Sequence, residues 1–537
     1  MSKRMIGVFA ALLFAFSGLM MRLYQVAEGG WEQAASNQAK ITVTLARARG
    51  TIYDRNGVAL TNKTTRYKAS VVSTPEALAS LSELLPSEEW TTLREQLQNG
   101  KPVVTELDEN ITIARGVSLV LAPVRYAQEQ LAAHVIGYVG DDGVHGVTGI
   151  EKAYDEWLNT CGGEATVTYE TDGRGQVLPG GKVEVNNTLA AAKAGVVLTL
   201  DAAVQRAVEV RCAPLLDKGA VVVIDPKNGD VLAMASFPSF DTSTLANYLT
   251  AENAPLFNRA TAAYNCGSVF KILSTVTALE SGVSATQSYH CSGSLRVGSN
   301  VIKCHHTFGH GQQELYDAFI HSCNPYYIQL IQQVGSSNLY RMAISLGFGG
   351  SLTLTKGYAT APSVFPTAAE LLQPTALANL SFGQGDLTAT PLHIAQMTAS
   401  VVNNGSFHPL RLVKATIAAD GKQTEIPQEP LVRLYSGSNA ALLRDMMRGV
   451  VEEGNGAAAC PDHGGAGGKT GTAETGWLAQ DGNTMVQSWF TGFYPAEDPQ
   501  YVITVLSEDA DTTGKQAAPV FKAVCDELYK LLDKPKR

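Results

Sequence analysis

The chain has no excess of basic residues. Its 537 residues include 41 lysines and arginines against 50 aspartates and glutamates, which gives a formal net charge of −9. A general nucleic-acid binder presents a basic face to the phosphates. The charge balance therefore argues against nucleic acid as a partner of this protein.

Tandem repeats and long low-complexity tracts are also missing, which argues against a repeat array. Only 17% of the residues are charged and 45% are apolar, proportions that can build ordinary buried cores. A chain of this length is too long for one compact domain, and we expect two or three.

One uncharged apolar run stands near the N-terminus. It extends from Met5 to Met21, and Arg22 closes it. Its 17 residues are at the short end of what spans a bilayer, but Leu23–Ala27 extends the helix if Arg22 snorkels to the interface. The pattern predicts a transmembrane anchor over residues 5–27.

The charges around this run predict its orientation. Lys3 and Arg4 precede it and a long polar remainder follows, which indicates that residues 1–4 are cytoplasmic and the C-terminal domain is outside the plasma membrane. The alternative is a cleaved signal peptide, although no small-x-small cleavage site follows the run closely. In both cases the bulk of the chain is exported.

The region after the anchor, residues 28–196, shows little chemistry. Asn56-Gly57 is a hairpin-turn signal inside the stretch Arg47–Gly57, and Pro86–Asn99 has a helical, acidic pattern. A glycine-rich patch, Gly137–Gly149, follows. We interpret this region as a mixed α+β pedestal that holds the next domain away from the membrane.

The character of the sequence changes near Val196, where the second domain, residues 197–537, begins. Strands at both ends of this region, with helices between them, predict an α+β fold in which one antiparallel sheet is completed by the two ends and an all-helical part is inserted. The expected elements are a strand at Val197–Asp201, a helix from Ala202, a hairpin at Ala220–Met234, helices at Ser268–Ser281 and Pro325–Val334, strands at Ser488–Tyr494 and Tyr501–Leu506, and a helix at Ala517–Leu532.

A serine and a lysine stand one helical turn apart in Ser268-Val-Phe-Lys271. The i to i+3 spacing puts the hydroxyl and the amine on one helix face. A serine hydroxyl becomes a useful nucleophile when a neighbouring base takes its proton, and a lysine does so when burial keeps it neutral. The motif alone is weak, since a chain of this length holds about one or two by chance.

Two further motifs follow in the chain. Ser322-Cys323-Asn324 is followed by Pro325, which favours Asn324 as an N-cap with Ser322 just ahead of a helix. A second match, Ser336–Asn338, is interpreted as a helix-end cap. Lys469-Thr470-Gly471-Thr472 follows two glycines, a pattern typical of a strand edge that receives a peptide by β-pairing, although a lone Lys-Thr-Gly is more often an ordinary hairpin lead-in.

The order of the three motifs is the one found in penicillin-binding proteins and class A β-lactamases. Nearly the whole chain resembles a class B penicillin-binding protein. The resemblance to the family's pedestal lies in Arg47–Gly57 and Gly149-Ile150-Glu151. The resemblance to its transpeptidase domain lies in Asp225–Met234 and Phe382–Gly385. One departure is visible: Asn265-Cys266 stands where the family often has proline before the Gly-Ser, but no group that the chemistry needs is lost.

The resemblance implies a serine D,D-transpeptidase of peptidoglycan that needs no cofactor for its chemistry. Ser268 would attack the carbonyl between two D-alanines of a stem peptide, and β-lactams would trap it. The implied roles of the other residues are general base for Lys271, proton relay for Ser322 and Lys469, orientation for Asn324, carboxylate binding on the strand Thr470-Gly471-Thr472, and an oxyanion hole from the backbone N–H groups of Ser268 and Thr472, each donor worth about 3 kcal/mol.

The resemblance also implies partners. The sequence contains no recognisable glycosyltransferase domain, so we expect a membrane glycan polymerase of the shape, elongation, division and sporulation family to contact the pedestal and anchor. The enzyme could serve elongation, division or sporulation. The alternatives are a β-lactamase, which would need neither pedestal nor anchor, a membrane-bound penicillin sensor, which would have several spans, and a scaffold without activity.

Histidines and cysteines cluster between residues 290 and 323. Cys291, Cys304, His310 and Cys323 form the pattern Cys-x12-Cys-x5-His-x12-Cys, and three cysteines with one histidine are a common structural zinc sphere. Some elongation-type class B enzymes look similar here, with acidic residues in place of the first two cysteines. A Cys291–Cys304 disulfide or an inert, buried Cys323 are the alternatives.

Overall fold

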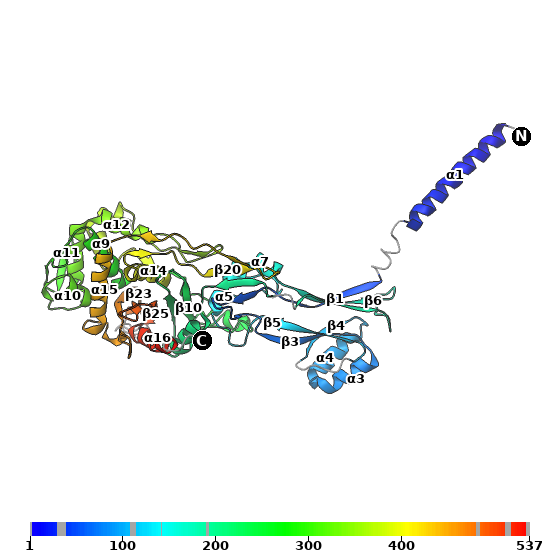
Figure 1. Cartoon of the computed structure of the whole chain (residues 1–537), viewed down its shortest axis with the longest axis horizontal. Coiled ribbons are helices and arrows are strands. Elements are labelled where there is room, and N and C mark those ends of the chain that lie inside the picture. The colour runs from blue at the N-terminus through cyan, green and yellow to red at the C-terminus, as the bar shows by residue number, and fades with distance from the viewer. Residues whose placement is uncertain are drawn as a thin grey trace. The chain divides into compact units, whose positions relative to one another are not determined.

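The computed structural model describes residues 3–28, 39–107, 114–140, 142–189, 193–478, 484–510 and 517–532. An N-terminal helix, α1 (Lys3–Glu28), is long and apolar enough to cross a membrane (Figure 1). It covers the predicted anchor at residues 5–27. The predicted cytoplasmic end, residues 1–4, lies partly outside the described residues.

The rest of the chain forms two compact units. Residues 39–49, 64–125 and 162–189 belong to one unit, and residues 50–63, 126–161 and 193–532 belong to the other, within the described ranges. The predicted domain bounds, 28–196 and 197–537, stay predictions. The segments 50–63 and 126–161 fold with the second unit although they precede residue 197.

The first unit contains two antiparallel sheets, with strand orders β1-β6-β7 and β4-β3-β5. Thr74 starts the helix that covers the second sheet, since its hydroxyl accepts from the Ala77 backbone N–H at 3.2 Å and Pro75 follows. Leu81 and Leu93 belong to the helices and are buried in the core between the helices and this sheet. The elements are β1 (Lys40–Arg47), β3 (Thr64–Val71), α3 (Pro75–Leu84), α4 (Ser87–Leu97), β4 (Val103–Leu107), β5 (Val117–Val124), β6 (Glu164–Glu170) and β7 (Val183–Asn187).

The central sheet of the second unit has the strand order β10-β9-β25-β24-β23, all antiparallel. Its strands are β9 (Gly219–Ile224), β10 (Val231–Phe237), β23 (Gly467–Leu478), β24 (Thr484–Tyr494) and β25 (Tyr501–Ala510). The two ends of this region therefore complete one sheet, which confirms the predicted topology.

Helices cover both faces of this sheet because alternate residues of a strand point to opposite sides. Val221 and Val223 of β9 pack under α8 (Ala202–Cys212) and α16 (Ala517–Leu532), whereas Val222 and Ile224 pack in the large core on the other side. That core is formed with α9 (Lys271–Glu280), α10 (Leu315–Ile320), α11 (Asn324–Val334), α12 (Ser336–Ser345), α13 (Pro374–Ser381), α14 (Pro391–Val402) and α15 (Gly437–Glu452) (Figure 1).

The remaining elements of the second unit are short. A further sheet has the order β2-β8-β20-β21, and small hairpins or bridges connect the others. Their bounds are β2 (Thr51–Tyr53), α5 (Ala133–Ile136), α6 (Gly149–Ala153), α7 (Asp155–Thr160), β8 (Gly195–Leu198), β11 (Tyr264–Asn265), β12 (Tyr289–Cys291), β13 (Ser294–Val297), β14 (Asn300–Lys303), β15 (Gly311–Gln313), β16 (Thr353–Thr355), β17 (Tyr358–Ala359), β18 (Thr388–Ala389), β19 (Ser406–Phe407), β20 (Val413–Ile417), β21 (Gln423–Glu425) and β22 (Val432–Arg433).

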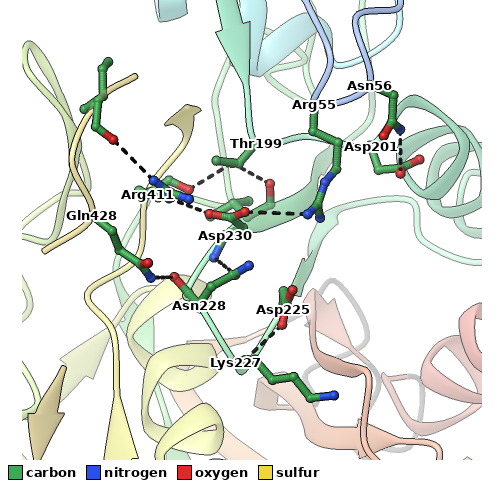
Figure 2. Close-up of polar contacts among 12 residues, drawn as sticks. Arg55, Asn56, Thr199, Asp201, Asp225, Lys227, Asn228, Asp230, Arg411 and Gln428 are labelled. Atoms are coloured by element: carbon green, nitrogen blue, oxygen red, sulfur yellow. Dashed lines mark hydrogen bonds and ion pairs between the residues drawn. The ribbon is translucent and has the colours of Figure 1, made fainter. Parts of the chain in front are cut away.

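Within the stretch Arg47–Gly57, the residues after β2 make polar contacts with distant segments of the second unit. Figure 2 shows the Asp230 carboxylate between Arg411, at 2.5 Å, and Arg55, at 3.8 Å. Asn56 donates to Asp201, which is the N-cap of α8, at 3.0 Å. Asp230 is 2% exposed, so its charge is stabilised by this pairing. The turn after β2 is thereby joined to the β9–β10 hairpin and to the start of α8.

The sequence interpretation was wrong about two helix starts in this unit, apart from the N-cap of α11 described below. The match Ser336–Asn338 opens α12 instead of ending the preceding helix, because Gly335 at φ +85° ends α11 and the next helix starts at once. The expected helix Ser268–Ser281 begins with a 3₁₀ turn at Gly267–Phe270, and α9 proper starts at Lys271.

Candidate active site

Ser268 lies in the 3₁₀ turn that precedes α9, pressed against strand β23. Gly267 has φ +61°, and a Cβ on it would lie 2.4 Å from the Thr472 carbonyl oxygen. A Cβ on Gly471 would in turn lie 2.9 Å from the Cys266 carbonyl oxygen. Only glycine permits so close an approach of the two backbones, which puts the Ser268 turn beside Thr472.

Lys271 connects the first two motifs. Its Nζ lies 3.1 Å from Ser268 Oγ, 3.0 Å from Ser322 Oγ, 2.7 Å from the Ser322 carbonyl oxygen and 2.7 Å from Asn324 Oδ1. The two carbonyl oxygens can only accept hydrogen bonds. A neutral amine has two N–H groups, and donating both to these oxygens directs its lone pair toward the serine hydroxyls.

Burial supports the neutral form of this amine. Lys271 is fully buried, and desolvation lowers its pKa from 10.5 to about 7. Such a lysine is partly deprotonated at neutral pH, and its free lone pair faces the Ser268 hydroxyl. The arrangement is that of a nucleophile with an adjacent base.

The Ser322-Cys323-Asn324 segment differs in one respect from the sequence interpretation. The N-cap of α11 is Cys323, and Asn324 is the first helical residue. The Asn324 side chain is therefore not used for capping and accepts from Lys271 instead. Ser322 is buried with φ +54°, a left-handed conformation that is uncommon for serine and is found at functional sites.

The third motif lies on β23, which is an edge strand of the central sheet. Lys469 is fully buried and donates to the Thr470 carbonyl at 3.3 Å, with its amine 5.6 Å from the centre of the Phe319 ring. Burial, with a smaller contribution from Lys271, keeps the pKa of Lys469 well below its usual value. The Thr470 hydroxyl donates to Asn455 at 3.1 Å.

The three motifs open into one cavity of about 920 Å³ within the second unit. Sequence reasoning missed some of its lining. Asn455 and Trp489 belong to no sequence motif, whereas Phe382 and Gln384 lie in the stretch Phe382–Gly385, which resembles the family's transpeptidase domain. The predicted residues that line the cavity are Ser268, Ser322, Asn324, Thr470, Gly471 and Thr472, and Lys271 and Lys469 are buried behind them.

The predicted metal ligands also converge. The ligand atoms of Cys291, Cys304, His310 and Cys323 all lie within 4.8 Å of one another, and Cys304 Sγ is 3.5 Å from His310 Nδ1. The three cysteines are buried and carry free thiols. Cys323 separates Ser322 from Asn324, and Cys304 lines the cavity, so this cluster adjoins the candidate active site.

Comparison with protein families gives two matches. Residues 219–526 match the Penicillin binding protein transpeptidase domain, and residues 44–189 match the Penicillin-binding Protein dimerisation domain. The first match covers more than half of the chain and contains every candidate catalytic residue.

Curated relatives match over nearly the full chain. Stage V sporulation protein D of Bacillus subtilis is 28% identical, with 91% of this chain and 79% of the relative covered. The peptidoglycan D,D-transpeptidase MrdA of Haemophilus influenzae is also 28% identical, with 98% and 91% covered.

Solved structures are similar as well. Penicillin-binding protein 3 of Mycobacterium tuberculosis, in complex with aztreonam, has a TM-score of 0.66 at 25% identity, with 92% of this chain and 98% of that chain covered. A structure described as a peptidoglycan synthase complex that coordinates polymerization and crosslinking has a TM-score of 0.67 at 25% identity, with 100% and 99% covered.

Proposed function

The chain belongs to the penicillin-binding protein transpeptidase family, and on this premise we propose that it is a serine D,D-transpeptidase that cross-links peptidoglycan stem peptides. The observation that carries the proposal is the fully buried Lys271 amine, 3.1 Å from Ser268 Oγ, with its two strongest acceptors fixed by Ser322 and Asn324. Relatives named peptidoglycan D,D-transpeptidases support the choice of substrate.

Acylation uses Ser268 and Lys271. The Ser268 oxygen attacks the carbonyl of the penultimate D-alanine while Lys271 takes the hydroxyl proton. The backbone N–H groups of Ser268 and Thr472 stabilise the negative oxygen of the tetrahedral intermediate, and the close contact of Gly267 with Thr472 supports their pairing. The carbon–nitrogen bond then breaks, and the terminal D-alanine leaves with a proton on its amine.

The proton reaches the leaving amine through the hydroxyl of Ser322, whose Oγ lies 3.0 Å from the Lys271 amine. Lys469 shares this proton relay from its fully buried position, where burial lowers the pKa of its amine. Thr472, exposed in the cavity, and Thr470 bind the terminal carboxylate of the donor peptide. Asn324 orients Lys271 and the peptide amide.

Deacylation transfers the peptide to an acceptor. The amine of a neighbouring stem peptide attacks the ester carbonyl and loses its proton to the Lys271 amine. The ester bond then breaks, and Ser268 leaves and regains its hydroxyl proton. A cross-link forms and the enzyme returns to its starting state. β-Lactams mimic the D-Ala-D-Ala end of the donor and acylate Ser268 through their ring carbonyl, and the aztreonam complex of a similar structure supports this recognition.

Membrane attachment and a polymerase partner complete the proposal. The helix α1 anchors the chain as a single pass, with residues 1–4 cytoplasmic and the transpeptidase domain outside the plasma membrane. A membrane glycan polymerase of the shape, elongation, division and sporulation family supplies the glycan strands. This chain matches, over its full length, one chain of the structure described as a peptidoglycan synthase complex, which supports this partnership.

A structural zinc ion is a further part of the proposal. Three thiols and one imidazole nitrogen within 4.8 Å of one another match the donors that a tetrahedral zinc ion takes. The convergence of four ligand atoms, where a Cys291–Cys304 disulfide would need only two sulfurs, favours the metal. Cys291, Cys304, His310 and Cys323 would hold the ion, and through Cys323 it would stabilise the left-handed Ser322.

Labelling of the full chain with a fluorescent penicillin tests the function. We expect one adduct, mapped by mass spectrometry to the peptide that contains Ser268. An adduct on another residue would refute the assignment of the nucleophile, and a folded chain without any adduct would refute the function.

A further inference from the structure

The free edge of β23 is partly occupied by the chain itself. Within the described part of the chain, β23 pairs only with β24, so its other edge faces the cavity. Along a strand, residues two apart direct their backbone N–H and C=O groups to the same edge. Gly267 contacts the Thr472 carbonyl, and the Asn265 side chain donates to the Glu474 carbonyl at 3.1 Å, so Thr472 and Glu474 both face the free edge.

Asn265 is fixed from two further sides. Its strand β11 pairs with β18 through the register of Asn265 with Thr388. Its carbonyl oxygen accepts from the indole N–H of Trp489 at 2.8 Å, and Trp489 is buried in β24 directly opposite Gly471. Asn265 is therefore a rigid connection between the segment that leads to Ser268 and the β23–β24 pair.

The bond of Asn265 to Glu474 limits the movement of the two segments that form the proposed oxyanion hole. The two proposed donors, the N–H groups of Ser268 and Thr472, come from segments that form no regular ladder with each other. Gly267 limits how closely these segments can approach, because a Cβ at this position would lie 2.4 Å from the Thr472 carbonyl oxygen. The Asn265–Glu474 bond, three residues before Ser268 and two after Thr472, limits how far they can separate or slide.

We propose that Asn265 is a positioning residue of the oxyanion hole. This inference rests on the proposed function, because it assumes that an acyl group is bound between Ser268 and Thr472.

The test uses the full chain with Asn265→Asp and Asn265→Ala. Asp keeps the shape of the side chain and removes the N–H donor, so both variants lose the bond to Glu474. The matched control is Asn338→Ala, because the Asn338 amide also donates to a backbone carbonyl, that of Val334 at 3.2 Å, but lies on α12 and does not line the cavity.

Stopped-flow acylation by a fluorescent penicillin separates the binding constant from the acylation rate constant. We expect both Asn265 variants to lose about 10-fold to 100-fold in the rate constant, as for a misplaced catalytic geometry, with a binding constant within about twofold of wild type. The melting temperature should change no more than in Asn338→Ala, whose rate constant should equal that of wild type.

The outcomes separate the inference from the function. If the wild-type chain is acylated and both Asn265 variants keep its rate constant, the positioning role is refuted and the function stands. A loss that appears only in the binding constant, or that equals the loss in Asn338→Ala, also refutes the positioning role. A folded wild-type chain that is never acylated at Ser268 refutes the function itself.

Discussion

The burial of Lys271 makes acylation depend on pH in a defined direction. Desolvation lowers the pKa of this amine from 10.5 to about 7. At 1.36 kcal/mol per pKa unit, the site disfavours the ammonium form by about 5 kcal/mol relative to water. The neutral form, which is the base, therefore gains population as pH rises through about 7.

The expected rate profile follows from this titration. With a pKa near 7, about one amine in ten is neutral at pH 6 and about nine in ten at pH 8. The rate constant for acylation by a penicillin should rise about tenfold between these values and level off above them. Stopped-flow measurements at saturating penicillin isolate the rate constant, and the melting temperature at each pH verifies that the chain is folded.

The same pKa shift also makes the free energy of unfolding depend on pH. Between about pH 7 and pH 10.5 the unfolded chain keeps the Lys271 proton that the folded chain has lost. The contribution of this group to the free energy of unfolding therefore rises with pH across that window.

The acylation rate constant gives the test of the base. A rate constant that is flat from pH 6 to pH 8, or that falls with rising pH, would refute Lys271 as the base.

Three other predictions concern the anchor, the metal and the hairpin network. Protease added to intact spheroplasts should digest everything beyond residue 27, and a protected C-terminal domain would contradict the proposed orientation. The purified chain should contain about one zinc per molecule. Cys323→Ala should lose the zinc and slow penicillin acylation, whereas metal-free chain that acylates normally, with Cys291 and Cys304 resistant to alkylation until reduced, would establish the disulfide. Asp230→Asn should lower the free energy of unfolding by about 2 kcal/mol, because it leaves two arginines without their buried partner. Lys530→Gln, which removes an exposed ion pair with Glu527, should change it by less than about 0.5 kcal/mol, and equal effects would contradict the role of Asp230.

The sequence allowed prediction of the parts that follow local rules. The helix Ala517–Leu532 has the predicted bounds because its apolar periodicity is uninterrupted. The ordered motifs also predicted which groups meet, since Ser268, Lys271, Ser322 and Asn324 are joined by hydrogen bonds in the structure. These predictions depended on spacing along one helix and on motif order, which are both readable from a single chain.

Other features depend on contacts between distant segments and could not be predicted. Nothing near Arg55 indicates that it approaches Asp230, 175 positions later, or that residues 50–63 fold with the second unit. Asn455 lines the cavity only because the loop after α15 lies beside β23. The N-cap was displaced by one residue, to Cys323, because the Asn324 side chain bonds to Lys271 instead of to its own helix.

The central claim is that Ser268 carries the acyl group from one stem peptide to another amine. The most direct test incubates the full chain with a donor peptide ending in D-Ala-D-Ala and a labelled D-amino acid as acceptor. We predict that the label replaces the terminal D-alanine, and that Ser268→Ala abolishes the exchange while the protein remains folded. Exchange at the wild-type rate in Ser268→Ala would contradict the account.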